Sequence, residues 1–399
     1  MAGRDVFGRF ATHFLGARRA DSFTPSVHRG RVLSTENTIR SRLKGSPLAI
    51  LFTAVLVDMM GFGIVIPVLP FYALEMDATP LQVTLLIASF SAMQMAATPL
   101  WGRFSDRHGR RPLIIAGLFA SAVSYLIFGM ANSLALLLLS RIAAGAAGGT
   151  ISVAHAYVAD TTTAEGRAHG MGLIGAAAGL GVMLGPAVGG FFSEISLSAP
   201  GYVAAALCAL NGLAAIFLLP ESRTAEQRRP KEGAQAGTLR TWIRSMVAQP
   251  LATLLGVYFL GITSFTALTA LLALYFEQRF GISAREMGFI FAISGGVTVV
   301  VRGVVLGRLV RRFGEIATVR AGAFVLGLAI VAVPFLPSFY WALGIAPLYA
   351  FGAGTLFPAL ATLTSFAADD DSRGAILGGS QFVGGLGRVV GPLWAGFLF

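Results

Sequence analysis

The chain has 399 residues, of which 55% are hydrophobic and only 12% are charged. Soluble domains carry about 25% charged residues, so this composition excludes an ordinary soluble protein and indicates a membrane protein. The formal net charge is +11, but the basic residues lie in the gaps between apolar stretches, as orientation signals do. We therefore expect anionic lipid, and no nucleic acid, as the partner of this charge.

Residues 1–47 form a basic segment that is rich in Arg and Ser and contains few acids. The segment lacks the apolar core of a secretory signal peptide, which excludes that class of leader. Its composition also resembles that of an organelle transit peptide. We interpret it as a poorly ordered cytoplasmic tail that keeps the N-terminus inside.

Eleven apolar stretches have roughly the 20-residue length that a membrane-spanning helix needs. They are Leu48–Leu74, Leu81–Trp101, Leu113–Met130, Leu134–Ala159, Gly170–Phe192, Tyr202–Leu219, Leu251–Phe276, Met287–Leu306, Ala317–Leu336, Phe339–Ala367 and Ala375–Phe399. With the N-terminus inside, the basic gaps fall on the cytoplasmic side, as the positive-inside rule expects. The outer gap Glu277–Glu286 is an exception, because it contains Arg279 and Arg285. The pattern predicts a multi-pass protein of a bacterial inner membrane.

A polar run within residues 220–250 divides the apolar stretches into two groups. Residues 48–219 hold six stretches and residues 251–399 hold five. We therefore expect an N-terminal six-helix bundle, a cytoplasmic linker and a C-terminal bundle. Symmetry predicts a twelfth helix, which is missing from this chain and favours a fragment or a truncated product.

Two sequence repeats relate the two groups. Gly102–Gly109 (Gly-Arg-x-x-Asp-Arg-x-Gly) returns as Gly307–Gly314 (Gly-Arg-x-x-Arg-Arg-x-Gly). Arg167 precedes Gly185 by 18 positions (185 − 167), and Arg373 precedes Gly391 by 18 (391 − 373). Parallel repeats of this kind build two pseudo-symmetric six-helix bundles with a binding site between them. We therefore predict an all-α membrane transporter.

Five motifs carry further information. They are Gly102–Arg111 between the second and third stretches, Arg141–Gly145 in the fourth, Gly181–Gly190 in the fifth, Asp58–Pro70 in the first and Ala156–Asp160 at the end of the fourth. Together they resemble the major facilitator superfamily, specifically its twelve-helix drug:proton antiporter branch, and the last two are similar to segments of tetracycline/proton antiporters. The resemblance covers roughly Leu48 to Phe399.

The resemblance implies the major facilitator fold and proton-coupled efflux of a small hydrophobic compound by alternating access. It also implies a monomer whose partners are a small-molecule substrate, protons and the lipid bilayer. In the third stretch Ser124 precedes Tyr125, where tetracycline exporters carry an acid, which argues against tetracycline as the substrate. The sequence contains no metal-ligand cluster, Gly-Lys-Ser/Thr nucleotide loop or nucleophile constellation. We therefore expect no metal, no cofactor beyond a proton gradient, and no enzyme activity.

Asp58 is a carboxyl that lies about 10 residues, or about 15 Å, into the first stretch. Such a group is costly in a membrane unless it is paired, hydrated or protonated, and it is functional by default. Arg141 in the fourth stretch has a stem long enough to reach the same level, and the resemblance associates this arginine with proton coupling. Burial opposes the charge of Asp58 and a cation favours it, so we predict that Asp58 binds and releases the coupled proton. The alternative is a static ion pair that fixes packing.

The motif Gly102–Arg111 predicts a gate loop at the cytoplasmic surface. Its single acid, Asp106, is a group that the free amides of a helix N-terminus stabilise. We expect Asp106 to contact the start of the eleventh stretch near Arg373 and to latch the two bundles together. Gly102 and Gly109 permit a tight turn. The alternative is a solvated orientation loop, which already explains part of the basic residues Arg107, Arg110 and Arg111.

The antiporter motif of the fifth stretch comprises Gly181, Gly185, Pro186, Gly189 and Gly190. Small residues at this spacing let helices approach closely, and Pro186 removes one helix hydrogen bond, which favours a bend. Plain close packing is sufficient for most of these glycines. The resemblance adds the interpretation that the packing seals a leak path.

Other polar side chains inside the stretches are candidates for the lining of a central cavity: Gln94, His155, Asn211, Gln381 and Arg388. For any one such residue an interhelical hydrogen bond is the commoner role. His155 is also a candidate for coupling, because histidine changes charge near neutral pH. An unpaired arginine in mid-span is costly, so Arg388 either attracts an anionic substrate or pairs with the missing helix.

Two alternatives to efflux come from the same residues. Proton-coupled uptake of a sugar or other small solute is one, and the antiporter motif argues against it. A non-transporting membrane sensor or a degenerate fragment is the other, and the missing helix suggests it. Dye movement driven by a pH gradient and lost with a protonophore excludes the sensor. The direction of substrate movement separates export from uptake.

Overall fold

The structure is a computed structural model, and it describes residues 47–222, 249–367 and 373–399. The predicted tail 1–47 lies outside the described residues except for Pro47, and so does most of the predicted linker 220–250. Within the described ranges the chain forms helices and short turns, and no strand.

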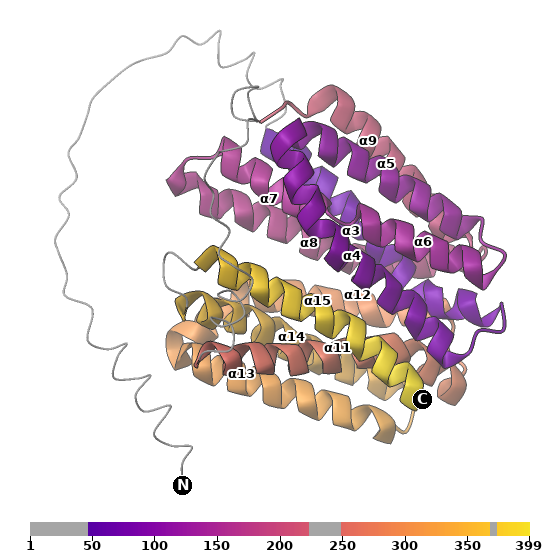
Figure 1. The fold of residues 1–399 in the computed structure, drawn as a ribbon. Helices are drawn as coiled ribbons and strands as arrows, with labels where there is room; N and C mark the ends of the chain where they lie inside the picture. The colour runs from indigo at the N-terminus through magenta and orange to yellow at the C-terminus, as the bar shows by residue number, and fades with distance from the viewer. Residues whose placement is uncertain (1–46, 223–248, 368–372) are drawn as a thin grey trace, which may run out of the picture. The chain divides into compact units, whose positions relative to one another are not determined.

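The helices fall into two groups (Figure 1). The N-terminal half contains α3 (Pro47–Leu74), α4 (Pro80–His108), α5 (Arg110–Gly129), α6 (Leu134–Ala147), α7 (Thr150–Thr161), α8 (Ala164–Phe192) and α9 (Ala199–Leu218). The C-terminal half contains α11 (Leu251–Phe280), α12 (Ala284–Val300), the π-helical turn η2 (Val301–Val305), α13 (Leu306–Ala332), the 3₁₀ turn η3 (Val333–Phe335), α14 (Phe339–Phe366) and α15 (Arg373–Leu398). All but three of the eleven predicted stretches correspond one to one with a helical span that is long and apolar enough to cross a membrane, the fourth to α6 and α7 together.

The three exceptions have identifiable causes. Nine spans among the described residues meet the length and apolarity of a membrane crossing, and one of them, Ala284–Phe335, contains both the eighth and the ninth predicted stretches. The chain kinks inside this span at Gly314, whose backbone has φ 80° and ψ 167°. The helix α15, which corresponds to the eleventh stretch, is not one of the nine, because it is rich in glycine and carries Arg388 in its middle.

The basic motif Gly102–Arg111 is not the open loop that its charge suggested. Helix α4 continues to His108 and α5 begins at Arg110, so Gly109 alone separates the two helices. Gly109 has φ 102° and ψ 162°, a backbone conformation that glycine adopts without the strain of a side chain. Gly314 occupies the corresponding place of the repeat with nearly the same angles. We call the end of the helices at Gly109 and Gly314 the basic end.

The fourth predicted stretch is broken into α6 and α7 at Gly148 and Gly149. Two side chains of α4 bind the carbonyl groups that the break leaves free. Trp101 donates its Nε1–H to the Ala146 carbonyl over 2.6 Å, and Gln94 donates from Nε2 to the Gly148 carbonyl over 3.3 Å. The apolar pattern runs through this break without change, and for that reason the sequence did not predict it.

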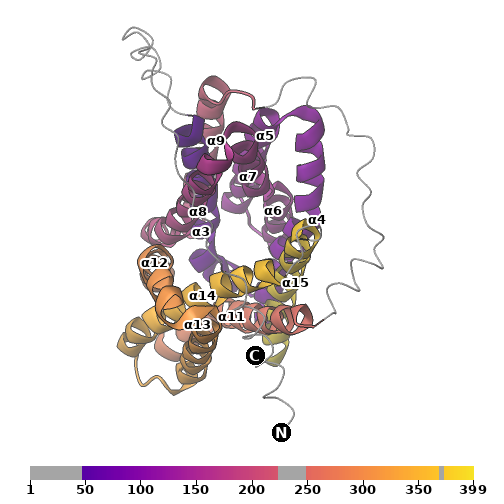
Figure 2. The ribbon, with the colours of Figure 1, turned by 90° about the vertical axis from the view of Figure 1, so that its left-hand side faces the viewer.

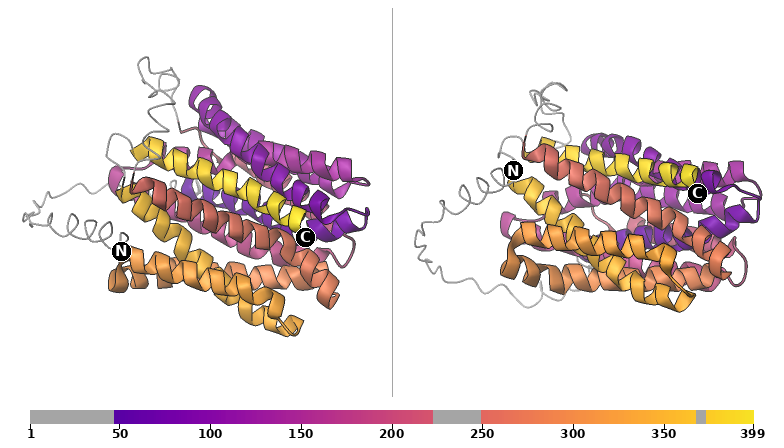
Figure 3. Two further views of the ribbon diagram at one scale, coloured as in Figure 1. Left: turned by 60° about the horizontal axis from the view of Figure 1, so that its bottom comes forward. Right: turned by 90° about the horizontal axis from the view of Figure 1, so that it is seen from below.

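The two halves meet mainly through two helix pairs, α8 with α12 and α4 with α15 (Figure 2). The views in Figure 3 also show α15 running beside α11 within the C-terminal half, in agreement with their contacts. By contrast, α13 packs on α14 and lies away from the N-terminal half. Helices α11, α12 and α15 therefore present residues to the boundary between the halves.

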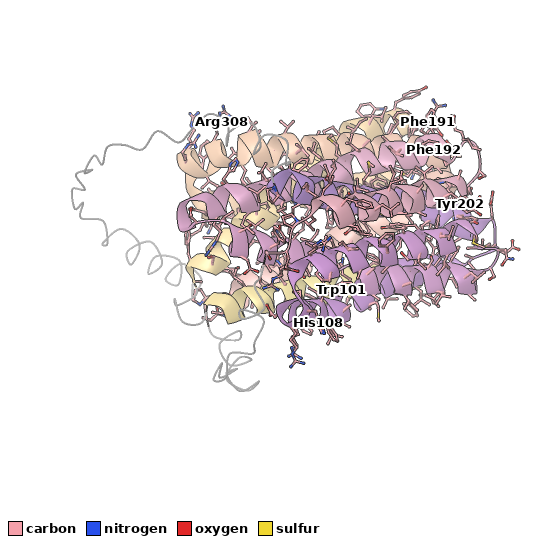
Figure 4. The ribbon with its side chains drawn as sticks, turned by 90° about the horizontal axis from the view of Figure 1, so that it is seen from above. Trp101, His108, Phe191, Phe192, Tyr202 and Arg308 are labelled. Atoms are coloured by element: carbon pink, nitrogen blue, oxygen red, sulfur yellow. The ribbon has the colours of Figure 1, made fainter. Side chains whose placement is uncertain are left out.

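The end of the helices away from Gly109 carries aromatic side chains and the ion pair between Glu194 and Arg285. Figure 4 shows Phe191, Phe192 and Tyr202 at this end, away from Arg308. Exposed Tyr and Phe near the ends of spanning helices are typical of a membrane–water interface. We call this end the opposite end.

Candidate functional site

Asp58 lies in the interior of the N-terminal half, 11 residues after Pro47 and 16 before Leu74 (58 − 47 and 74 − 58). Only 4% of its surface is exposed. Ser121 of α5 donates its hydroxyl to Asp58 Oδ1 over 3.0 Å. The Thr150 hydroxyl, at the start of α7, also interacts with this carboxyl, although it makes no hydrogen bond of ordinary geometry. A carboxyl with so few polar partners gains little by remaining charged, which suits a group that exchanges a proton.

Arg141 is buried as well, but it does not form an ion pair with Asp58. Its guanidinium carbon lies 5.1 Å from the ring centroid of Phe128 and 6.0 Å from that of Tyr125. Its Nε donates to Ser140 Oγ over 3.3 Å, and Nη2 has no hydrogen-bond partner. The Tyr125 ring also packs on Gly61 of α3, where an added Cβ would lie 2.7 Å from the ring. The guanidinium group is therefore held by the aromatic rings of α5 and not by the carboxylate of Asp58.

Close packing of α8 on α3 fixes the position of the helix that carries Asp58. Three glycines of the antiporter motif face α3, and their nearest neighbours are backbone atoms. A Cβ added at Gly181 would lie 2.5 Å from the Leu56 carbonyl oxygen, and one at Gly185 would lie 2.6 Å from Gly63 Cα. Gly189 faces the Ile64 carbonyl in the same way. The motif therefore holds the stretch of α3 that begins at Leu56 and contains Asp58.

Gly190 lies one residue further along and faces the C-terminal half instead. A Cβ there would lie 3.0 Å from the Arg285 carbonyl oxygen and 3.2 Å from Gly288 Cα of α12. Gly288 in turn approaches the carbonyl of Pro186, where an added Cβ would lie 2.6 Å away. The ion pair between Arg285 and Glu194 lies beside this contact, with both side chains nearly half exposed. The antiporter motif thus joins the two halves at the opposite end.

Arg110 organises the basic end. Its Nη2 lies 2.7 Å from Asp106 Oδ1 and its Nε lies 2.9 Å from Asp160 Oδ2 at the end of α7. Nη1 donates to Ser105 Oγ over 2.5 Å, and the backbone N–H of Arg110 donates to Glu221 Oε1 over 2.9 Å. The side chain is buried to 95%. Its positive charge is neutralised by these acids of the N-terminal half. The sequence interpreted Arg110 as an orientation signal, and the structure adds this structural role.

The other residues of the basic motif have separate places. Arg111 donates from Nη2 to the Ile216 carbonyl of α9 over 2.5 Å, whereas Arg107 is exposed and Gly102 has open space beside it. The expected contact of Asp106 with the start of α15 adjoins residues 368–372, which lie outside the described residues. The latch therefore stays a prediction.

Arg110→Ala is expected to destabilise the protein by about 3 kcal/mol, because it removes the cation shared by Asp106 and Asp160 and leaves Asp160 partly buried without it. The measurement is the thermal unfolding temperature in detergent. Arg107→Ala removes an arginine of the same motif from an exposed position and is expected to leave this temperature within a degree or two. Equal effects of the two changes would contradict the role given to Arg110.

The five candidate cavity residues have different surroundings. Gln94 binds the helix break described above, and Asn211 donates from Nδ2 to the Ala54 carbonyl of α3 over 3.2 Å. These two are interhelical hydrogen-bond donors, the commoner of the two predicted roles. Gln381 is exposed, His155 is half-buried, and neither is hydrogen-bonded to a described residue. Arg388 is half-buried in α15 with its Nε buried and unpaired.

Several partners of these residues were not predictable from the sequence. Ser121 and Glu221 contribute through contacts between distant parts of the chain, and their residue types carry no signal of their own. Arg302 is different, because it lies inside the apolar stretch Met287–Leu306 and an ionisable residue there was visible in the sequence. No group of three or more His, Cys, Asp or Glu among the described residues is placed to hold a metal ion.

Comparisons with known proteins point to one family. A model of the Major Facilitator Superfamily matches residues 51–392. The tetracycline resistance protein, class C, of Escherichia coli is 34% identical over 350 residues, which cover 87% of this chain and 88% of that protein. Multidrug resistance protein 2 of Bacillus subtilis (strain 168) is 28% identical over 354 residues, or 88% of each chain.

Two solved structures are also similar. The human organic anion transporter MFSD10 (TETRAN) superposes with a TM-score of 0.64 at 26% identity, over 88% of this chain and 92% of that one. A bacterial homolog of the human lysosomal transporter Spinster gives a TM-score of 0.72 at 18% identity, over 88% of this chain and 81% of that one. This second likeness concerns the fold alone.

Proposed function

Because this chain belongs to the major facilitator superfamily and is similar to proteins named for tetracycline and multidrug resistance, we propose that it exports drug-like organic compounds in exchange for protons. The protein is an integral multi-pass membrane protein. We place it in a bacterial inner membrane with its basic end in the cytoplasm. The concentration of arginine at that end supports this orientation.

The observation that carries the proposal is the position of Asp58. It lies far from both ends of α3, and it is buried with Ser121 as its hydrogen-bond donor. A secondary transporter needs a group inside the membrane that takes up a proton on one side and releases it on the other. In the proposed cycle Asp58 is that group. Its burial and the Ser121 hydroxyl set how easily it becomes charged.

Ser121 is suited to both forms of the acid. Its hydroxyl donates to Oδ1 when Asp58 is ionised and accepts a hydrogen bond when Asp58 is protonated. Asp58 can therefore gain or lose a proton while Ser121 remains its hydrogen-bond partner. A substrate that favours the ionised form expels the proton, and a returning proton expels the substrate.

Alternating access requires the two halves to separate at one end and then at the other. In this structure the contacts of Gly190 with Gly288, and of Glu194 with Arg285, join the halves at the opposite end. We assign the structure to the inward-facing state on this basis. The same contacts must open for the compound to leave on the outer side.

Fixing the opposite end is therefore expected to stop transport. The double variant Glu194→Cys and Arg285→Cys, joined by a short bifunctional thiol reagent, should lose transport and regain it on reduction. The native Cys208 is fully buried and does not compete for the reagent. Glu194→Cys with Arg279→Cys is the matched control, since Arg279 binds the Pro334 carbonyl instead. Normal transport by the crosslinked 194–285 protein would contradict alternating access at this contact.

The experiment that tests the proposed function uses purified protein in liposomes and a fluorescent drug such as ethidium. A pH gradient that is acidic on the side facing the opposite end should drive the dye toward that side. A protonophore should abolish the movement. Movement of the dye with the proton gradient, in the same direction as the protons, would indicate uptake. Absence of any coupled movement over a panel of dyes would favour a sensor.

A further inference from the structure

A buried hydroxyl of the N-terminal half has no hydrogen-bond partner among the described residues. Thr150 is the first residue of α7, and its side chain is fully buried. Its Oγ1 is unpaired, and α7 begins without a side-chain cap. Burying a hydroxyl without a partner costs free energy, so most such groups in packed interiors are hydrogen-bonded. The exception at Thr150 therefore requires an explanation.

The packing of α7 on α5 places this hydroxyl near Asp58. A Cβ added at Gly117 of α5 would lie 2.6 Å from Thr150 Oγ1. Gly117 precedes Ser121 by four residues (121 − 117), so both lie on one face of α5, about one helical turn apart. Ser121 is the residue that donates to Asp58. The Thr150 hydroxyl thus lies about one turn along α5 from the present donor to the acid.

The packing of α7 on α3 gives the same position. The two helices are in contact, and Ala154 of α7 and Ala54 of α3 belong to one buried cluster. Helix α7 runs toward the basic end, where its Asp160 lies, and α3 runs away from that end. Thr150 is four residues before Ala154, and Asp58 is four residues after Ala54. Both side chains therefore lie on the side of the cluster that faces the opposite end.

Two side chains of α4 fix the start of α7. Trp101 and Gln94 donate to carbonyl groups of the break between α6 and α7. They also fill the space beside its glycines: a Cβ added at Gly149 would meet the Trp101 ring, and one at Gly148 would lie 2.7 Å from Gln94 Nε2. Because Thr150 follows Gly149 directly, these contacts determine where its hydroxyl lies.

The ionised form of Asp58 is short of hydrogen-bond donors. Ser121 is the one side chain of the described residues that donates to it with ordinary geometry. The guanidinium group of Arg141 is held by the rings of α5 and does not form an ion pair with it. A buried carboxylate with one donor is costly, and a hydrogen bond to a charged group is stronger than one to a neutral group. A second hydroxyl donor would therefore favour release of the proton.

We propose that Thr150 donates a hydrogen bond to Asp58 when the acid loses its proton, and that Gln94 and Trp101 are positioning residues that hold Thr150 in place for this step. The Thr150 hydroxyl is unpaired while Asp58 is protonated and turns to the carboxylate when the transported compound binds. No covalent bond of Thr150 changes, and the proton that leaves Asp58 passes to water. The inference deepens the proposed efflux function and rests on Asp58 as the coupled group.

The test is Thr150→Val, which removes the hydroxyl and keeps the branched side chain. The infrared band of the protonated carboxyl group is recorded for the full-length protein in lipid while ethidium is added. We expect the band to keep its position but to need about tenfold or more ethidium to disappear, because one hydrogen bond to the charged form is lost. The unfolding temperature should not fall, since the deleted hydroxyl has no partner in the folded protein.

The conservative variant Thr150→Ser keeps the hydroxyl and should restore the ethidium dependence. Thr161→Val is the matched control, because it makes the same change at the exposed end of the same helix. Its ethidium dependence should equal that of the unaltered protein.

Gln94→Met removes a donor to the break and keeps the length of the side chain. It should also raise the ethidium requirement, and Trp101→Phe should act in the same direction. If Gln94 acts through Thr150, Gln94→Met should cause no further rise in the Thr150→Val background, which a double-mutant cycle measures. Additive effects of the two changes would overturn the positioning role.

An unchanged ethidium dependence in Thr150→Val would overturn the proposal. So would a displaced band together with a lower unfolding temperature, which is the result expected of a merely structural role. The unaltered protein separates this failure from a failure of the proposed function. If its band responds to ethidium and a pH gradient drives ethidium movement, export stands whatever Thr150→Val shows. If its band does not respond, both the proposed function and the role of Thr150 are contradicted.

Discussion

Asp58→Asn is expected to reduce efflux driven by a pH gradient to background while the protein still folds and inserts. Asparagine has nearly the same size, and its carbonyl still accepts the hydrogen bond from Ser121. It cannot bind or release a proton, so the step that couples the proton to the substrate is lost. The measurement is the initial rate of dye movement into liposomes under an imposed gradient.

The matched control is Asp77→Asn, the same chemical change at an exposed position just beyond the end of the same helix. Asp77 has φ 55°, a conformation that asparagine also tolerates. The initial rate of dye movement by Asp77→Asn should equal that of the unaltered protein. Exchange of labelled for unlabelled substrate needs no proton and should persist in Asp58→Asn, which excludes a folding defect. Gradient-driven efflux at the normal rate by Asp58→Asn would remove the proposed role.

Gly185→Leu is expected to cause a large loss of stability. An added Cβ at this position would lie 2.6 Å from Gly63 Cα and from the Met60 carbonyl oxygen, and neither backbone atom can rotate away. A whole isobutyl group forces α8 and α3 apart, at a cost of about 3 kcal/mol or more. Because α3 carries Asp58, transport should fall together with the unfolding temperature.

Gly175→Leu places the same side chain on the same helix where nothing lies within 4 Å of the added Cβ. Its unfolding temperature and transport rate should stay close to those of the unaltered protein. Passive proton leak into liposomes, read with an internal pH dye, separates the two interpretations of the motif. Increased leak in Gly185→Leu would support a seal, and reduced stability without leak would support plain packing. A fully stable and active Gly185→Leu would contradict both.

The sequence predicted the helices well because a membrane span has one dominant requirement, about 20 apolar residues in a row. The same requirement made Asp58 visible, since a carboxyl in such a run is rare. Gly109 and Gly314 were also predictable from the repeat, and they share a backbone conformation that suits glycine. In these cases a local property of the chain determines the structure.

Contacts between distant segments were not predictable in the same way. The break at Gly148 and Gly149 depends on donors from α4, which lie more than 40 residues earlier in the chain. The position of Arg141 depends on two aromatic rings of α5, so its stem length alone did not reveal its partner. The burial of Arg110 depends on Asp160 and on Glu221, 111 residues away. Nothing in a single sequence identifies these residues as partners.

The measurement that tests the central account most directly is infrared difference spectroscopy of the purified protein in lipid, with and without a transported compound. We expect a band of a protonated carboxyl group that disappears when the compound binds, and that is absent at all times from Asp58→Asn. Release of one proton for each bound compound should accompany the change. A carboxyl band that is the same with and without the compound, or that survives in Asp58→Asn, would contradict the exchange of a proton at Asp58.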